Sequence, residues 1–351
     1  VAGQDGSVWV FDQGRLFRLG LAGSIEAAVL ADYQPDISVA PDGVVWALGR
    51  GEWGADALFS LAEGEWTEHE VPEVVAVTGI ETPADGSVWT TWAVGTGQTG
   101  DCGPGGRLSV ARLVDGAWQE AAVEPAMHGG GSLAIGPDGS SLLGTTSCGE
   151  YPLTGPLERD GDRWVPSITT EPDASPYPNG VGPIVIGKDG TAWAYAEGDW
   201  DLGWPPRLLR RSVGEWERFG DDESVPLLVG SQLWDPSMTV SNDGRLWVAF
   251  DHPEFALDDH RRAFDNKSFL GTLDGGCPGV ISFDGVAWEQ HLPGACARNV
   301  SAAPDGNVWV TVVEKADYAA WARDYGAQPL DTERAPPGLY VITPEAVAMT
   351  E

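Results

Sequence analysis

Short runs of alternating apolar and polar residues recur along the chain, and each run ends at a turn signal. The clearest signal is an apolar stretch followed by Asp-Gly, two further residues and then Trp. Copies start at Asp5, Asp42, Asp85, Asp189, Asp243 and Asp305, and one more starts at Asp138 with Leu142 in the Trp position. Asp-Gly tolerates the positive φ of a tight hairpin turn, while the β-branched and aromatic residues beside it favour strands. Each copy therefore predicts one β-hairpin.

Two further strands are predicted after each hairpin. Apolar segments such as 16–19, 58–61, 208–210 and 339–342 predict a third strand, and a turn that usually reads Gly-x-Trp, as at Gly64, leads into a fourth. Four antiparallel strands in seven copies are the layout of a propeller, because one unit alone cannot bury both of its faces. We expect the recurring Trp residues to pack between units as core and not to bind a ligand.

The sequence thus predicts an all-β fold, a seven-bladed β-propeller of four-stranded antiparallel blades. We expect one domain over residues 1–351, with blades at approximately 1–32, 33–74, 75–125, 126–172, 173–224, 225–294 and 295–351. Helix is expected only in the insertions of the last two blades, for example within 319–323, which has good helix formers.

The repeat resembles that of bacterial propellers of the two-component-regulator and virginiamycin-B-lyase-like type. Their repeats also run from an apolar strand through Asp-Gly to a strand that contains Trp, and the resemblance covers essentially the whole chain. It concerns blade architecture. The lyase-like type includes enzymes with a His and a Glu at a metal-bearing channel mouth, but those residues cannot be matched position by position in this sequence.

The surplus residues of the chain concentrate between the second and third strands. The interval from the second-strand marker to the third strand grows from 7 residues after Trp9 to 33 after Trp247 and 30 after Trp309. In a propeller these loops share a face with the crossovers between blades, and the Asp-Gly turns occupy the opposite face. Long loops on one face of a repeat scaffold usually mark its binding side.

We therefore predict that a ligand binds on this loop-rich face. The candidate residues lie in its loops and crossovers or are aromatic outside the repeat positions: His128, Asn179, Trp200, Trp204, Trp234, Asp235, His252, Arg298 and Trp321. Alternative interpretations stay open: the glycines after His128 as a flexible turn, the loop of His252 as a solvated charged segment, and the tryptophans as local hydrophobic clusters that pin their own loops.

All four cysteines fall on the same predicted face. We expect disulfides between Cys102 and Cys148 and between Cys277 and Cys296, because a propeller makes these segments neighbours, although four cysteines allow three pairings. The alternative is four reduced thiols. Disulfides predict an oxidising, extracellular or cell-surface location.

Composition narrows the class of partner. The net charge is −33, which repels phosphate backbones and anionic lipid surfaces, so we expect no nucleic acid partner and no membrane insertion. The chain starts at Val1 without a signal-like segment, so we expect a mature or excised domain. We also expect a monomer whose partner is a small molecule, a glycan or a protein.

Catalytic signals are sparse. The sequence has no P-loop, no HExxH and no GxSxG, and His69 and His291 are expected to be exposed residues of edge strands. We expect no cofactor and no metal. The leading hypothesis is an extracytoplasmic ligand-binding, sensory or interaction propeller without catalytic activity, and the rival is a metal-dependent lyase of the virginiamycin-B-lyase-like type.

Overall fold

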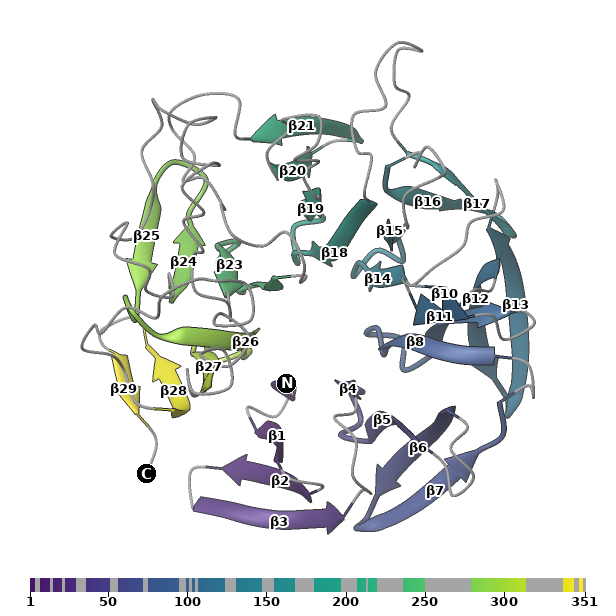
Figure 1. Ribbon diagram of the computed structural model, residues 1–351, viewed down its shortest axis with the longest axis horizontal. Coiled ribbons are helices and arrows are strands. Elements are labelled where there is room, and N and C mark those ends of the chain that lie inside the picture. The colour runs from purple at the N-terminus through teal and green to yellow at the C-terminus, as the bar shows by residue number, and fades with distance from the viewer. Residues whose placement is uncertain are drawn as a thin grey trace. The chain divides into compact units, whose positions relative to one another are not determined.

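The computed structural model describes the strands of the chain and most of their tight turns. The described residues are 1–3, 7–12, 15–20, 23–29, 36–50, 56–71, 75–94, 99–100, 103–104, 107–123, 131–146, 155–167, 180–196, 207–212, 214–219, 236–249, 279–313, 337–343 and 347–349. Every regular element among them is a β-strand, so the described part of the chain is all-β (Figure 1). The helix expected within 319–323 lies outside these residues, and no described helix is long and apolar enough to cross a membrane.

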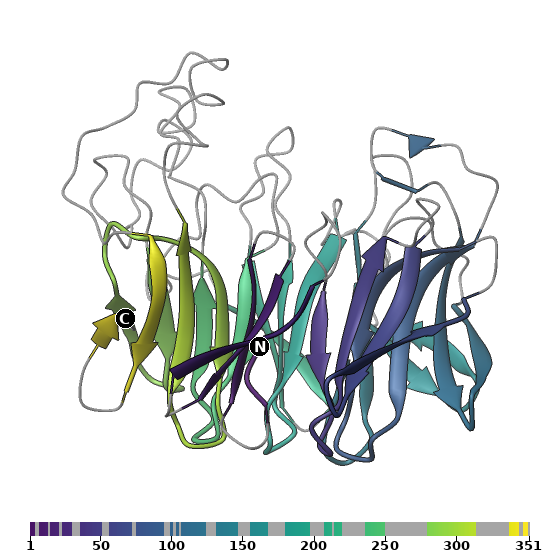
Figure 2. The ribbon, with the colours of Figure 1, turned by 90° about the horizontal axis from the view of Figure 1, so that it is seen from below.

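The chain forms two compact units, Val1–Gly190 with Ala303–Asp305, and Thr191–Ala302 with Gly306–Glu351. The expectation of a single domain over residues 1–351 is not tested by the described contacts and stays a prediction. Figure 2 shows the strands of each sheet side by side, coloured in chain order.

The first unit contains successive antiparallel groups of strands. They are β1 (Val8–Asp12), β2 (Arg15–Gly20) and β3 (Gly23–Val29); β4 (Ile37–Val39), β5 (Val45–Arg50), β6 (Asp56–Ala62) and β7 (Glu65–His69); β8 (Val75–Glu81), β9 (Val88–Val94), β12 (Arg107–Val114) and β13 (Ala117–Val123); β14 (Gly131–Ile135), β15 (Ser141–Thr146), β16 (Leu157–Asp160) and β17 (Arg163–Pro166); and β18 (Gly180–Ile186). The short strands β10 (Thr99–Gly100) and β11 (Gly103–Pro104) pair with each other.

The second unit repeats the same order of strands. It contains β19 (Ala192–Ala196), β20 (Arg207–Ser212) and β21 (Glu215–Phe219); the four-stranded sheet of β22 (Ser237–Val240), β23 (Leu246–Ala249), β24 (Val280–Phe283) and β25 (Trp288–His291); and the four-stranded sheet of β26 (Cys296–Ala302), β27 (Val308–Val313), β28 (Gly338–Ile342) and β29 (Val347–Met349). Within each of these groups, strands that follow one another in the sequence pair antiparallel.

The Asp-Gly turns are where the sequence predicts them. Each described copy places Asp-Gly between two consecutive strands that are neighbours in a sheet, and the glycines have φ from 74° at Gly86 to 88° at Gly306. A side chain is strained at such a φ, which explains why Gly follows Asp in every copy. The Asp carboxylate accepts a hydrogen bond from the backbone N–H two residues on, for example from Val44 to Asp42 at 3.1 Å and from Ser140 to Asp138 at 2.9 Å. The repeat is therefore a side-chain-capped hairpin turn.

The recurring tryptophans pack between neighbouring sheets, as predicted. Trp9 joins Leu16, Val45 and Leu61 in one buried cluster, so β1–β3 and β4–β7 share a core. Trp89 packs in a cluster with Leu143 and with the fully buried Trp164. Burial of such large rings against the next sheet stabilises the contact between repeats.

Hydroxyl groups on the first strands provide a second link between neighbouring sheets. The Ser132 hydroxyl of β14 accepts the Ile184 N–H of β18 at 3.1 Å, and the Ser237 hydroxyl of β22 accepts the Val300 N–H of β26 at 3.1 Å. The hydroxyls of Ser38 and Thr82 are 2.7 Å apart. The first two bonds satisfy first-strand N–H groups that face the preceding sheet, so apolar packing and hydrogen bonding both connect the repeats.

Candidate functional site

Most residues of the predicted ligand face lie outside the described residues. These are His128, Asn179, Trp200, Trp204, Trp234, Asp235, His252 and Trp321. The described one is Arg298, which is half-buried in β26 at a register shift between Ala297 and Asn299. The extra residue at such a β-bulge re-aims side chains at that point of the strand. The ligand face stays a prediction.

One cysteine is described. Cys296 is buried at the start of β26 and is disulfide-bonded. Cys102, Cys148 and Cys277 lie outside the described residues, so the predicted pairings stay predictions.

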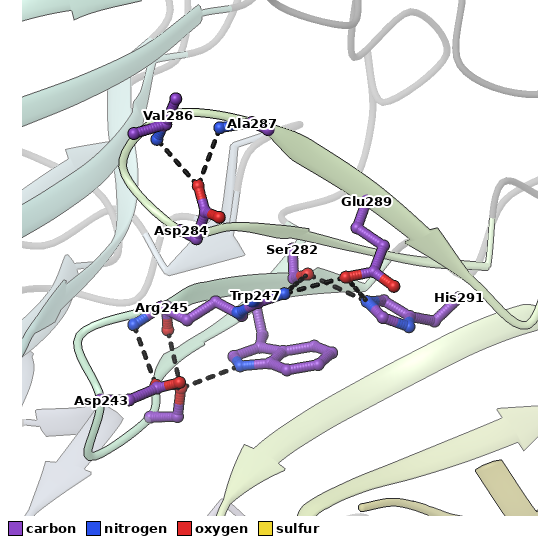
Figure 3. A network of polar contacts seen from close by, with 10 residues as sticks. Asp243, Arg245, Trp247, Ser282, Asp284, Val286, Ala287, Glu289 and His291 are labelled. Carbon is purple, nitrogen blue, oxygen red and sulfur yellow. Dashed lines mark hydrogen bonds and ion pairs between the residues drawn. The ribbon is translucent and has the colours of Figure 1, made fainter. Parts of the chain in front are cut away.

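A connected network of polar side chains lies in the sheet β22–β25 (Figure 3). The fully buried Ser282 of β24 lies directly opposite Trp247 in one neighbouring strand and Glu289 in the other. Its hydroxyl is 2.9 Å from Nε2 of His291 and accepts a hydrogen bond from Arg245 at 3.2 Å. Arg245 also donates to the Glu289 carboxylate at 3.0 Å, so one guanidinium links both groups (Figure 3).

The imidazole of His291 and the guanidinium of Arg245 both lie against the indole ring of Trp247. The imidazole of His291 lies with its centroid 4.8 Å from the indole centroid at 35°, and the guanidinium carbon of Arg245 is 5.9 Å from the indole centroid. The indole N–H donates to the Ser241 hydroxyl at 3.0 Å, and that hydroxyl donates to Asp243 of the Asp-Gly turn at 2.5 Å. The Asp-to-Trp spacing of the repeat thus connects the turn to the core through one serine.

The serine, histidine and glutamate of this network are not arranged to activate a nucleophile. The residue Ser282 is 0% exposed, so no substrate reaches its hydroxyl, and Arg245 already occupies one of its lone pairs. The Glu289 carboxylate is 3.9 Å from Nε2 of His291, the same nitrogen that contacts the serine. A base for nucleophilic catalysis is instead oriented from its other nitrogen. The arrangement joins three strands and keeps the serine hydroxyl buried.

A second copy lies in the sheet β4–β7. Ser60 is opposite Trp46, its hydroxyl is 2.8 Å from Nε2 of His69, and the imidazole and indole centroids are 4.7 Å apart at 35°. The two histidines were expected to be exposed, and this expectation is wrong: both are half-buried, and His291 keeps 11% side-chain exposure. The ring of a fourth-strand histidine covers the Trp two strands away, which the alternation of a single strand does not reveal.

Burial shifts the titration of both histidines in the same direction. Loss of water around the ring lowers the pKa of His69. The same desolvation lowers the pKa of His291, where Glu289 opposes the shift and Arg245 adds to it. Both rings are therefore held neutral to a lower pH than a free histidine.

Two carboxyl groups missed by sequence reasoning lie in the first unit. Desolvation, with a further contribution from the negative charge of Asp36, raises the pKa of Glu81 to about 8. Desolvation also raises the pKa of Asp36, the residue before β4. The signal in the sequence was a Glu at the end of the apolar run 75–80. Among the described residues no group of three or more His, Cys, Asp or Glu could hold a metal ion.

Comparison with known proteins identifies the fold. No model of a known protein family matches the chain, and no curated protein of similar sequence was found. Among solved structures, an acylaminoacyl peptidase from Pyrococcus horikoshii matches with a TM-score of 0.55 at 12% identity over 95% of this chain and 47% of that chain. The extracellular domain of BT4673 from B. thetaiotaomicron, described as a one component system, matches with 0.54 at 10% identity over 88% of this chain and 36% of that chain.

A third solved structure supports the same architecture. YCF48 bound to D1 peptide matches with a TM-score of 0.51 at 12% identity, over 88% of this chain and 86% of that chain. The neighbours are β-propeller-type proteins. The fold is of the β-propeller type. At such low identity these matches show the fold alone, and the chain spans well under two thirds of the BT4673 and peptidase chains.

Proposed function

We propose that the chain is an extracytoplasmic binding or sensory propeller without catalytic activity, built from seven four-stranded blades. The observation that carries this proposal is the position of Ser282, His291 and Glu289 within the strands of one sheet. The serine of this set is fully buried in a sheet, and the Trp–Ser–His part of the arrangement recurs at the same register in β4–β7. Because the Trp–Ser–His part lies at a repeat position, we attribute to it a role in packing the sheet.

The proposed location rests on two observations. Cys296 is disulfide-bonded, which is typical of oxidising compartments. One structural neighbour, BT4673, matches through its extracellular domain. We propose an extracellular or cell-surface location and a monomeric state.

The proposed binding side is the face that carries the long second-to-third-strand loops. Its supports are the length of those loops in the sequence and the commitment of the described strands to packing and capped turns. Trp200 and Trp234, outside the repeat positions, are the proposed aromatic anchors for a glycan, a flat small molecule or a protein segment. The net charge of −33 favours neutral or cationic ligands over anionic ones.

Ligand screening tests this proposal. Glycan and metabolite libraries are screened against the whole chain, and the affinity of each hit is measured for Trp200→Ala and Trp234→Ala. An aromatic anchor contributes at least ~2 kcal/mol, which is about thirtyfold in affinity. The control is Val286→Ala, because Val286 is 90% exposed on the β24–β25 turn, on the proposed opposite face. Unaltered affinity in both Trp variants, weaker binding in the control, or metal-dependent lyase turnover would contradict the proposal.

A further inference from the structure

The two Ser–His pairs differ in the charged groups around them. Around His291, Arg245 approaches from the segment before β23 and Glu289 lies on its own strand. The neighbouring sheet β26–β29 adds apolar side chains and Tyr340 to the cluster that contains Trp247. Desolvation raises the pKa of Tyr340, so this phenol stays neutral. The shift of His69, in contrast, is caused by desolvation, and no charged group among the described residues contributes to it.

Hydrogen-bond capacity limits what the Ser282 hydroxyl can do. A guanidinium only donates, so the hydroxyl accepts from Arg245, and its single hydrogen is then satisfied by the free lone pair of a neutral Nε2 on His291. A proton on Nε2 removes that lone pair. The serine hydrogen then loses the acceptor that it has in this structure, and a second cation lies beside Arg245.

We propose that His291 is an acid-sensitive clasp, whose protonation loosens β25 from the sheet β22–β25. The proton comes from solvent, since 11% of the His291 side chain is exposed. Glu289 limits the effect without cancelling it, because its carboxylate is 3.9 Å away while the serine oxygen is at 2.9 Å. The pair in β4–β7 has no Arg and no Glu at the matching positions, which hold Val44 and Thr67. That pair is the internal control.

The direction of the pH effect follows from linkage. A histidine with a folded-state pKa below its unfolded-state value destabilises the fold as pH falls through the unfolded-state value, because the unfolded chain takes up the proton first. The loss is complete below the folded-state value. The clasp is therefore closed at pH 7.5 and opens as the pH falls through the lowered pKa of His291.

Hydrogen–deuterium exchange of the whole chain tests the proposal. Exchange of peptides that cover β25 and β7 is measured at pH 7.5 and 5.5 and corrected for the intrinsic pH dependence of exchange. We expect protection of β25 to fall at least threefold more than protection of β7. In His291→Gln, which keeps an acceptor for the serine but does not titrate, the difference between β25 and β7 should disappear.

An NMR titration of the wild-type imidazoles keeps the test decisive if the variant fails to fold. The His291 ring should titrate below the free-histidine value of 6.5, and β25 exchange should follow the same midpoint. Equal changes in β25 and β7, a His291 midpoint at or above 6.5, or an acid response that survives His291→Gln in full would overturn the proposal. None of these outcomes bears on ligand binding at the loop-rich face.

Discussion

The sheets β4–β7 and β22–β25 hold the same Trp–Ser–His arrangement in the same register, and they differ in charge. In both, Ser lies opposite Trp, and His lies two residues beyond the partner of Ser in the fourth strand. In β22–β25 alone, Arg245 and Glu289 surround the pair. The Trp–Ser–His part is therefore a packing arrangement that the two repeats share, and the charged residues Arg245 and Glu289 occur in one of them.

Other repeats fill the position opposite Trp with arginine. Arg18, Arg112 and Arg210 lie opposite Trp9, Trp89 and Trp193, with guanidinium carbons 5.3 to 5.7 Å from the ring centroids. Where Leu142 replaces Trp, its partner is Glu158. The residue opposite the ring varies: an arginine lies opposite the indole in three repeats and a serine of a Ser–His pair in two, and Val341 lies opposite Trp309.

Truncation of the ring should have the largest effect and should differ between the two sheets. Trp247 is 7% exposed in a cluster shared with β26–β28, so Trp247→Ala should cost ~3–5 kcal/mol of unfolding free energy. Trp46→Ala should cost clearly less, because Trp46 is only partly buried. Urea unfolding followed by circular dichroism measures both values, and equal losses would argue against the comparison.

Removal of the hydroxyl should rank second. Ser282→Ala removes one hydrogen-bond partner from Arg245, which keeps Glu289, and one from His291, and we expect a loss of ~1–3 kcal/mol. Ser60→Ala leaves only His69 without its partner and should cost ~1 kcal/mol or less. The same unfolding experiment applies, and a larger loss in Ser60→Ala would show that Arg245 does not depend on the serine.

Replacement of the charged residues of β22–β25 by the residues at the matching positions of β4–β7 should change the pKa of His291. Arg245→Val removes a cause that lowers the pKa of His291, so that pKa should rise, whereas Glu289→Thr removes a cause that raises it, so that pKa should fall. The acid loss of stability should shrink in the first variant and grow in the second. NMR titration of the His291 ring reports both shifts, and movement of the two variants in the same direction would refute the assigned causes.

The ion pair itself should have the smallest effect. The Arg245 and Glu289 side chains are 27% and 61% exposed, and pairs of this kind contribute ~0.2–1 kcal/mol. A double-mutant cycle with Arg245→Gln and Glu289→Gln should return a coupling energy in that range, lower still in high salt. A coupling above ~2 kcal/mol would mean that the pair, and not the indole, organises the network.

The strands and the Asp-Gly turns could be predicted from the sequence because each copy carries its own local signal. Gly43 and Gly64, for example, both have the positive φ that their turns require. The burial of His69 and His291 could not be predicted, because it depends on a Trp and a Ser in two other strands of the same sheet. Local alternation places a residue on a face but does not say what covers that face.

The acidic pair Asp36–Glu81 was missed for a related reason. Glu81 reads as the polar end of an apolar strand, and its raised pKa arises from desolvation and from Asp36 of the preceding sheet. Such neighbours become visible only when sheets pack. The candidate residues of the loop-rich face lie outside the repeat pattern, so the proposed roles of Trp200, Trp234 and the others stay predictions.

Double-mutant cycles on the two Ser–His pairs test most directly whether these groups serve the repeat. Ser60→Ala with His69→Phe, and Ser282→Ala with His291→Phe, are compared with their single variants by urea unfolding at pH 7.5. The account predicts a stabilising coupling of ~0.5–1.5 kcal/mol in each sheet, larger for Ser282–His291 because Arg245 completes that network. A coupling of zero in both sheets would contradict it.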